Sequence, residues 1–104
     1  MENTVVEKRK YFSRCLEDAG FPELLRDAMK YLQVSGTPEY YGQEYIEAGD
    51  TRWMVRLRIK DNRLLEGWYT SAFGLTFHDA CRVAARDAIR KFAPPSAILS
   101  KGHH

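Results

Sequence analysis

The alternation of apolar and polar residues predicts a helix, three strands and a second helix, in that order, after residue 20. Apolar residues at helical spacing predict a first helix over residues 22–33, and Pro22 suits its first turn, where a backbone N–H would have no partner. The second helix is expected to begin at Thr76, whose hydroxyl can cap it, and to end before Pro94. Its predicted buried stripe consists of Phe77, Ala80, Cys81, Ala84, Ala88 and Phe92.

The three predicted strands cover residues 39–47, 51–60 and 64–73. In the second of them, Trp53, Val55, Leu57 and Ile59 alternate with Arg52, Met54, Arg56, Arg58 and Lys60. Such alternation is typical of an antiparallel sheet with one covered and one solvated face. Gly42 and Gly67 lie inside two of the strands and are interpreted as bulges. We therefore predict the α+β fold class, with a three-stranded antiparallel sheet covered by helices on one face.

An additional helix is predicted before this unit. Thr4 and Glu7 fit a capping box at a helix start, and apolar residues continue near one side as far as Ala19. Gly20 is suited to end the helix because it tolerates a left-handed conformation. The predicted organisation is a helical extension over residues 1–20, a domain over residues 21–93 and a flexible tail over residues 94–104.

Composition and charge limit which partners and which cellular compartment we expect for this protein. Sixteen Lys and Arg residues against fourteen Asp and Glu residues leave a net charge of +2, so attraction to phosphate depends on where the charges lie. Cys15 and Cys81 have no paired spacing, and no apolar leader precedes them. No run approaches the roughly 18 apolar residues that a membrane span requires. We expect an intracellular protein of the cytoplasm or nucleus that does not contact a membrane.

The sequence offers little for catalysis. Cys81 follows His78 by three residues, a spacing that can join a thiol to an imidazole base. Cys81 also lies on the apolar stripe of the second helix, which favours a core position instead. No glycine-rich phosphate loop, Ser, His and Asp constellation or metal-ligand spacing is present in the sequence. We therefore expect no enzyme activity, cofactor, metal or small-molecule substrate.

Several motifs over residues 21–92 carry a resemblance to a known family. They are Leu24, Leu25 and Tyr31, the Thr-Pro-Glu-Tyr run at 37–40, the Trp-Met-Val-Arg-Leu run at 53–57, and Ala80, Ala84 and Ala85. In these positions the chain resembles the double-stranded RNA-binding domain. The resemblance implies the same fold and, in members that bind RNA, contacts from the first helix and from the loop between the first two strands to two minor grooves. A lysine-rich turn at the start of the last helix grips the phosphates between them.

The chain departs from that family at the RNA contacts. The expected lysine positions hold Phe77, His78 and Cys81, and the loop at 47–51 is short and acidic. By resemblance, Asp27 stands where the family often has a Glu that meets ribose hydroxyls, although an ordinary exposed carboxylate explains Asp27 equally well. The resemblance therefore implies the fold more strongly than it implies RNA binding.

Two basic rows remain as candidate phosphate contacts. His78, Arg82, Arg86 and Arg90 recur at i, i+4 spacing and form a stripe along the second helix. The alternative is a solvated face in which Asp79 pairs with Arg82 and Asp87 pairs with Lys91. The second row consists of Arg52, Arg56, Arg58 and Lys60 on the open face of the sheet, where tyrosines can stack on bases or on a partner's side chains. Neutralisation by Glu44, Glu47 or Glu66 across the strands is the alternative there.

Trp68, Tyr69 and Phe73 lie on the third predicted strand, which is expected to form a sheet edge. An edge strand can receive a strand from another chain, although Trp68 can equally pack in the core. The leading hypothesis is a non-catalytic adaptor that acts through a protein partner or self-association at this strand or at the N-terminal helix. The alternative hypothesis is double-stranded RNA binding through the arginine stripe of the second helix.

Overall fold

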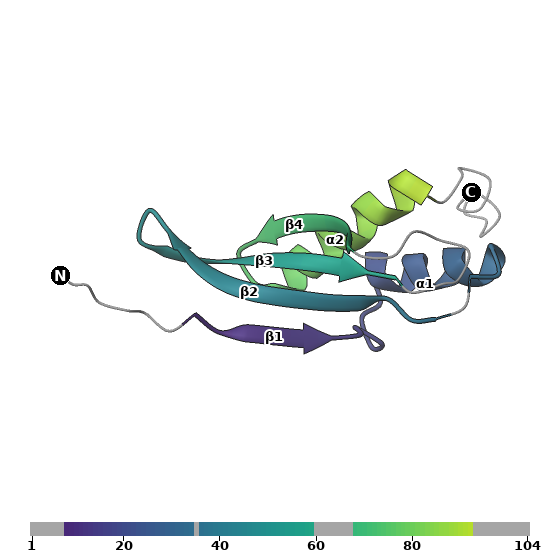
Figure 1. Cartoon of the computed structure of the whole chain (residues 1–104), viewed down its shortest axis with the longest axis horizontal. Helices are drawn as coiled ribbons and strands as arrows, with labels where there is room; N and C mark the ends of the chain where they lie inside the picture. The colour runs from purple at the N-terminus through teal and green to yellow at the C-terminus, as the bar shows by residue number, and fades with distance from the viewer. Residues whose placement is uncertain (1–7, 35, 60–67, 93–104) are drawn as a thin grey trace.

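In the part of the chain that the structure describes, four antiparallel strands form one sheet in the order β1-β2-β3-β4, and two helices pack together behind it (Figure 1). A computed structural model of the chain describes residues 8–34, 36–59 and 68–92. Its elements are β1 (Lys10–Ser13), α1 (Phe21–Tyr31), β2 (Glu39–Glu47), β3 (Asp50–Arg58), β4 (Trp68–Gly74) and α2 (Phe77–Phe92). The predicted α+β class is confirmed, and the sheet has one strand more than predicted.

The prediction of an N-terminal helix is wrong in the described residues, because Lys10–Ser13 form β1. This strand pairs with β2 from Lys10 opposite Gln43 to Ser13 opposite Tyr40. Its two aromatic residues point to opposite sides of the sheet, where Tyr11 meets Phe77 and Phe12 meets Tyr41. The apolar residues before Gly20 have helical spacing, but this signal is weak. Backbone pairing with the edge of β2 therefore determines the structure of residues 10–13. The predicted capping box lies outside the described residues.

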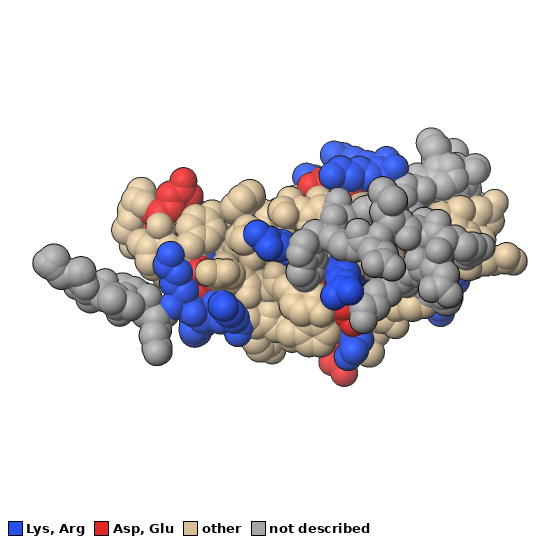
Figure 2. All heavy atoms as spheres, viewed as in Figure 1, with Lys and Arg blue, Asp and Glu red and all other residues tan. Residues whose placement is uncertain are grey.

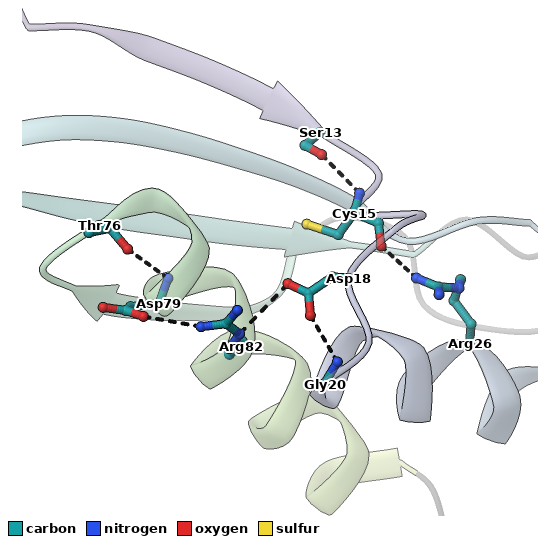
Figure 3. Close-up of polar contacts among 8 residues, drawn as sticks. All are labelled: Ser13, Cys15, Asp18, Gly20, Arg26, Thr76, Asp79 and Arg82. Carbon is teal, nitrogen blue, oxygen red and sulfur yellow. Dashed lines mark hydrogen bonds and ion pairs between the residues drawn. The ribbon is translucent and has the colours of Figure 1, made fainter.

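The connection from β1 to α1 is a turn held by local hydrogen bonds (Figure 3). Cys15 has a positive φ of 50°, and its N–H donates to the Ser13 hydroxyl oxygen. The Cys15 carbonyl accepts from the Asp18 N–H at 3.2 Å and from the Arg26 guanidinium at 2.6 Å. The Gly20 N–H in turn donates to Asp18 Oδ1 at 2.9 Å. These bonds turn the chain from the sheet edge into the first turn of α1.

The core lies between the helices and one face of the sheet. Its β3 members are Trp53, Val55 and Leu57, which confirms the alternation predicted for this strand. Ile59 follows the strand and is also buried. The helices contribute Leu25, Ala28, Met29, Phe77, Ala80, Cys81, Ala84, Ala85, Ala88 and Ile89. The predicted stripe of α2 is confirmed wherever its side chains are described, and the Phe92 side chain lies outside the described part.

Gly42 does not mark a bulge, because the register of β2 and β3 is continuous from Glu39 opposite Arg58 to Glu47 opposite Asp50. A Cβ atom at Gly42 would lie 2.5 Å from Phe77 Cδ1, so the glycine gives space to that ring. The irregularity in the sheet lies elsewhere. Between Leu57 and Arg58 the pairing with β4 shifts from Thr70 to Trp68 and skips Tyr69. Gly67 and the predicted start of the third strand at residue 64 lie outside the described residues, as does the predicted tail.

A buried carboxylate fastens the chain before β1 to the sheet. Glu44 is only 8% exposed, and its two oxygens accept from Arg9 Nε at 3.0 Å and Arg9 Nη2 at 2.6 Å. The backbone N–H of Arg9 also donates to Glu44 Oε1, and the Glu44 N–H donates to the Arg9 carbonyl. The guanidinium carbon lies 5.6 Å from the centre of the Trp53 ring. The hydrogen bonds from Arg9 hold the pKa of the Glu44 carboxyl below its ordinary value of 4.5.

We predict that the contribution of this pair to stability disappears in acid. Because the pKa of Glu44 is lowered in the folded state, the contribution is complete above pH 4.5 and is lost as the pH falls through the folded-state pKa. The measurement is the free energy of unfolding in urea between about pH 7 and pH 3. The difference in this free energy between the wild type and Arg9→Gln should be largest at neutral pH and should shrink in acid. Lys10→Gln, a neighbouring exposed position, serves as the control with a pH-independent difference. Equal pH profiles for the wild type and Arg9→Gln would contradict the prediction.

Candidate functional site

Both helices pack on one face of the sheet, and we call the opposite face the open sheet face. In the β2–β3 pairing, Tyr41 lies opposite Arg56, Gln43 opposite Met54 and Tyr45 opposite Arg52. The outer strands extend these rows, with Lys10 and Phe12 on β1 and with Ser71 and Phe73 on β4. Figure 2 views the molecule from this side, where Lys and Arg side chains lie among uncharged residues and beside some Asp and Glu side chains.

Two hollows lie next to each other on the open sheet face. One has a volume of about 340 Å³ and is lined by Lys10, Phe12 and Tyr41, and we call it the Phe12 hollow. The other has a volume of about 430 Å³ and is lined by Tyr45, Ser71 and Phe73, and we call it the Phe73 hollow. Gln43, Met54 and Arg56 line both hollows and form the wall between them. Among the described residues, neither hollow is lined by a carboxylate.

Each hollow contains a pair of aromatic rings with exposed surface. The Phe12 and Tyr41 ring centres are 4.9 Å apart at a tilt of 50°, and those of Tyr45 and Phe73 are 6.0 Å apart and nearly perpendicular. Phe73 is 60% exposed, so much of its surface is open to solvent. The pKa of the Tyr41 phenol is raised, first by its loss of solvent and then by the hydrogen bond that it donates to Glu39. Tyr41 therefore presents a neutral ring.

The arginines and tyrosines of this face were predicted from the sequence, but its β1 residues, Lys10 and Phe12, were not. Alternate residues of the Lys-Tyr-Phe-Ser run face opposite sides of the strand, but four residues are too few for this alternation to identify a strand. A helix was predicted across this run instead. The predicted basic row on β3 is confirmed as a row on the open face, and Arg52 at its end lies 4.0 Å from Glu47 and 3.9 Å from Asp50. Lys60, the last member of the predicted row, lies outside the described residues.

The arginine stripe on α2 lies on the molecular surface, and carboxylates oppose much of its charge (Figure 3). Arg82 Nε lies 3.7 Å from Asp18 Oδ2, and Arg82 Nη1 lies 3.4 Å from Asp79 Oδ1. Arg86 Nε lies 3.4 Å from Asp87 Oδ1. These ion pairs reduce the positive potential that the stripe can offer to phosphate.

Asp18 is a buried carboxylate that was not predicted as a site residue from the sequence. Its side chain is only 6% exposed, and it accepts from the Gly20 N–H while facing Arg82. A hollow of about 710 Å³ lies here between the β1–α1 connection and α2, but both signs of charge line it, including Glu17, Asp18, Arg14 and Arg82. We assign Arg82 and Asp18 to the attachment of the connection to α2, because each charge already has its partner within the fold.

The remaining sequence candidates lie apart from one another. His78 is exposed at the start of α2, whereas Cys81 has no exposed surface. The interaction with the Cys15 thiol and the burial of Cys81 raise the pKa of Cys81. A buried neutral thiol is not an available nucleophile, so the core interpretation of Cys81 is confirmed. Asp27 is half-buried on α1, on a different element from the stripe, and lines neither hollow of the open sheet face.

The fourth strand forms an edge of the sheet, as the sequence predicted for its third strand. β4 pairs with β3 on one side, and no other strand among the described residues pairs with it. Its sequence, Trp-Tyr-Thr-Ser-Ala-Phe-Gly, contains no charged residue and no proline. Phe73 and the following Leu75 are each 60% exposed. Trp68 and Tyr69 belong to the strand by their backbone, and their side chains lie outside the described part.

The described residues contain no group of three or more His, Cys, Asp and Glu side chains placed to hold a metal ion. No helix within the same residues has both the length and the apolar character needed to cross a membrane. Comparison of the chain with protein-family models, with curated proteins and with solved structures found no match.

Proposed function

We propose that this chain is a non-catalytic adaptor with an arrangement like that of the double-stranded RNA-binding domain, and that it associates with a second copy of itself along β4. The element order from α1 through β2, β3 and β4 to α2 is the order that the sequence resemblance implies. The observation that carries the proposal is the edge of β4, which has no charge and no proline and is flanked by exposed Phe73 and Leu75.

An unprotected edge strand is a template for another strand. Its outward N–H and C=O groups are unpaired, and natural proteins usually block such edges with Lys, Pro or a bulge. β4 has an irregularity only near its first residues, at the step from Trp68 to Thr70, so residues 70–74 offer a regular edge. A second copy suits this edge because two uncharged strands do not repel each other and because a two-fold axis makes the same contacts twice.

The other surfaces considered from the sequence have less support. Residues 10–13 form a strand rather than part of a helix, so the described residues contain no N-terminal helix that a partner could bind. Double-stranded RNA binding through α2 remains the alternative, and the carboxylates that face Arg82 and Arg86 weaken it.

Sedimentation velocity over a range of protein concentrations tests the proposal. We expect a monomer–dimer equilibrium for the wild type and at least about a tenfold weaker association for the double variant Phe73→Lys, Leu75→Lys, because lysines on an edge oppose strand addition. Ile46→Lys is the matched control, since Ile46 is 45% exposed and lies on β2. Circular dichroism checks that each variant is folded. A wild type that stays monomeric at several hundred micromolar, or a double variant that dimerises like the control, would refute self-association at β4.

A further inference from the structure

We propose that the open sheet face binds single-stranded RNA, with one base on the aromatic rings of the Phe12 hollow and another on those of the Phe73 hollow. The proposal rests on the juxtaposition of two aromatic hollows with a common wall that contains Arg56. It concerns the face of the sheet, whereas self-association concerns its edge. Phe73 takes part in both, so the binding test uses Tyr41 and Arg56, which lie on β2 and β3.

The aromatic rings are placed to accept two bases separately. Tyr41 and Tyr45 are four residues apart on β2 and on the same side of the sheet, which separates them by about 13 Å. This separation exceeds the roughly 3.4 Å between stacked bases of one strand, so the two bases would be splayed apart rather than stacked on each other. Splayed, unpaired bases stacked on aromatic side chains are the usual form in which proteins recognise single-stranded RNA.

The charges of the two hollows match a nucleic-acid backbone. Lys10 lies at the β1 side of the Phe12 hollow, and Arg56 lies in the shared wall. A phosphate between the two bases would pass over that wall, where the guanidinium can contact it through paired N–H groups. Lys10 and Arg56 thus place two cations against this lining, and the Glu39 carboxylate, which accepts from the Tyr41 hydroxyl at 3.0 Å, is not itself part of either lining.

The polar groups between the rings favour RNA as the occupant. The Gln43 amide and the Ser71 hydroxyl both line the Phe73 hollow, and each can donate and accept a hydrogen bond. A ribose 2′-hydroxyl is itself a donor and an acceptor, and it is the group by which proteins distinguish RNA from DNA. A duplex would not use these hollows, because its bases are stacked and paired and cannot present their faces to the four rings.

Fluorescence anisotropy with a labelled 12-nucleotide oligouridine tests the proposal. We expect Tyr41→Ala to weaken binding at least about fivefold, since the loss of one stacked base has at least that effect. Arg56→Gln should weaken binding and reduce the slope of log affinity against log salt by about 0.7, the value for one phosphate on a single strand. Arg90→Gln is the matched control, because Arg90 is an exposed arginine on α2 that lies outside both hollows, and it should bind like the wild type. Thermal unfolding establishes that each variant is folded.

Four competitors complete the experiment. Unlabelled oligouridine should displace the probe, whereas the matching oligodeoxyuridine and a duplex RNA of the same length should displace it much less. Equal displacement by the DNA would overturn the choice of RNA. If the duplex displaced the probe more strongly than oligouridine did, and Arg90→Gln lost binding, the site would lie on α2 instead. If an oligoglutamate peptide displaced the probe as well as oligouridine did, the partner would be an acidic protein. Absence of binding by the wild type at low salt would refute the proposal, whatever the oligomeric state of the protein.

Discussion

Replacement of Gly74 with alanine is expected to lower the melting temperature by roughly 10 °C. Gly74 ends β4, and a Cβ atom there would lie 2.6 Å from the backbone N of Ala80 and 3.1 Å from its Cα. These atoms belong to the first turns of α2 and cannot rotate away as a side chain can. Overpacking costs about 1–3 kcal/mol, and a contact with backbone lies at the upper end of that range. The reduced entropy of the unfolded chain offsets up to about 1 kcal/mol, which leaves a net loss of about 2 kcal/mol.

Gly20→Ala provides the matched control for this prediction. A Cβ atom at Gly20 would lie 3.4 Å from Asp18 Oδ1 and farther from Arg82, which is ordinary contact distance. Alanine is a poorer residue than glycine before a helix, so a loss below about 1 kcal/mol is expected. Thermal and urea unfolding of both variants give the comparison. If Gly74→Ala is no less stable than Gly20→Ala, α2 does not approach the end of β4 as closely as the structure shows.

Gly42→Ala is expected to destabilise the protein by about 2 kcal/mol, for a different reason. A Cβ atom at this position would lie 2.5 Å from Cδ1 and 2.6 Å from Cε1 of Phe77, and 3.3 Å from Cε3 of Trp53. Phe77 is 6% exposed, and it also meets the Tyr11 ring at a centroid distance of 4.7 Å. The ring therefore has no direction in which to move without disturbing β3 or β1.

A double-mutant cycle with Phe77→Ala checks this cause. Phe77→Ala alone is expected to cost about 3 kcal/mol, because it removes a large buried side chain. In the double variant the added methyl group enters the space that the ring has left, so Gly42→Ala should then cost almost nothing. The expected coupling energy in urea unfolding is about 2 kcal/mol. Additive losses would show that the ring and the glycine do not share this space.

The contact between Phe77 and Gly42 affects the proposed binding site as well as the core. Phe77 joins α2 to Tyr11 on β1 and lies against Gly42 of β2, so it sets how β1 lies beside the sheet. β1 in turn supplies Lys10 and Phe12 to the Phe12 hollow. We therefore expect changes at Phe77 to weaken binding at the open sheet face without a direct contact to the ligand.

The strands and helices after residue 20 were predictable because their signals are local. The alternation from Trp53 to Ile59 has the period of a strand, and the stripe of α2 has the period of a helix. The N-terminal strand was not predictable in the same way. Four residues carry too little periodicity to identify a strand, and β1 exists because the edge of β2 offers it backbone partners and because Arg9 binds Glu44.

The candidate sites were predictable only as residue types. The spacing of Arg82, Arg86 and Arg90 indicated a stripe on one helix, and the structure retains it. Its charge balance depends on Asp18, which is 64 positions from Arg82 and reaches it through the β1–α1 connection. No spacing rule relates residues so far apart in sequence.

By itself, then, the sequence determined the α+β class, the one-sided core and the edge position of the strand that contains Phe73, because each follows from a short-range period or from the order of the elements. Only the tertiary structure decided that β1 joins the sheet, that Gly42 and Gly74 make room for α2, and that Lys10 and Arg56 come to line a common hollow. These features depend on strand register and on close packing between segments distant in the chain, and such contacts leave no periodic trace in the sequence.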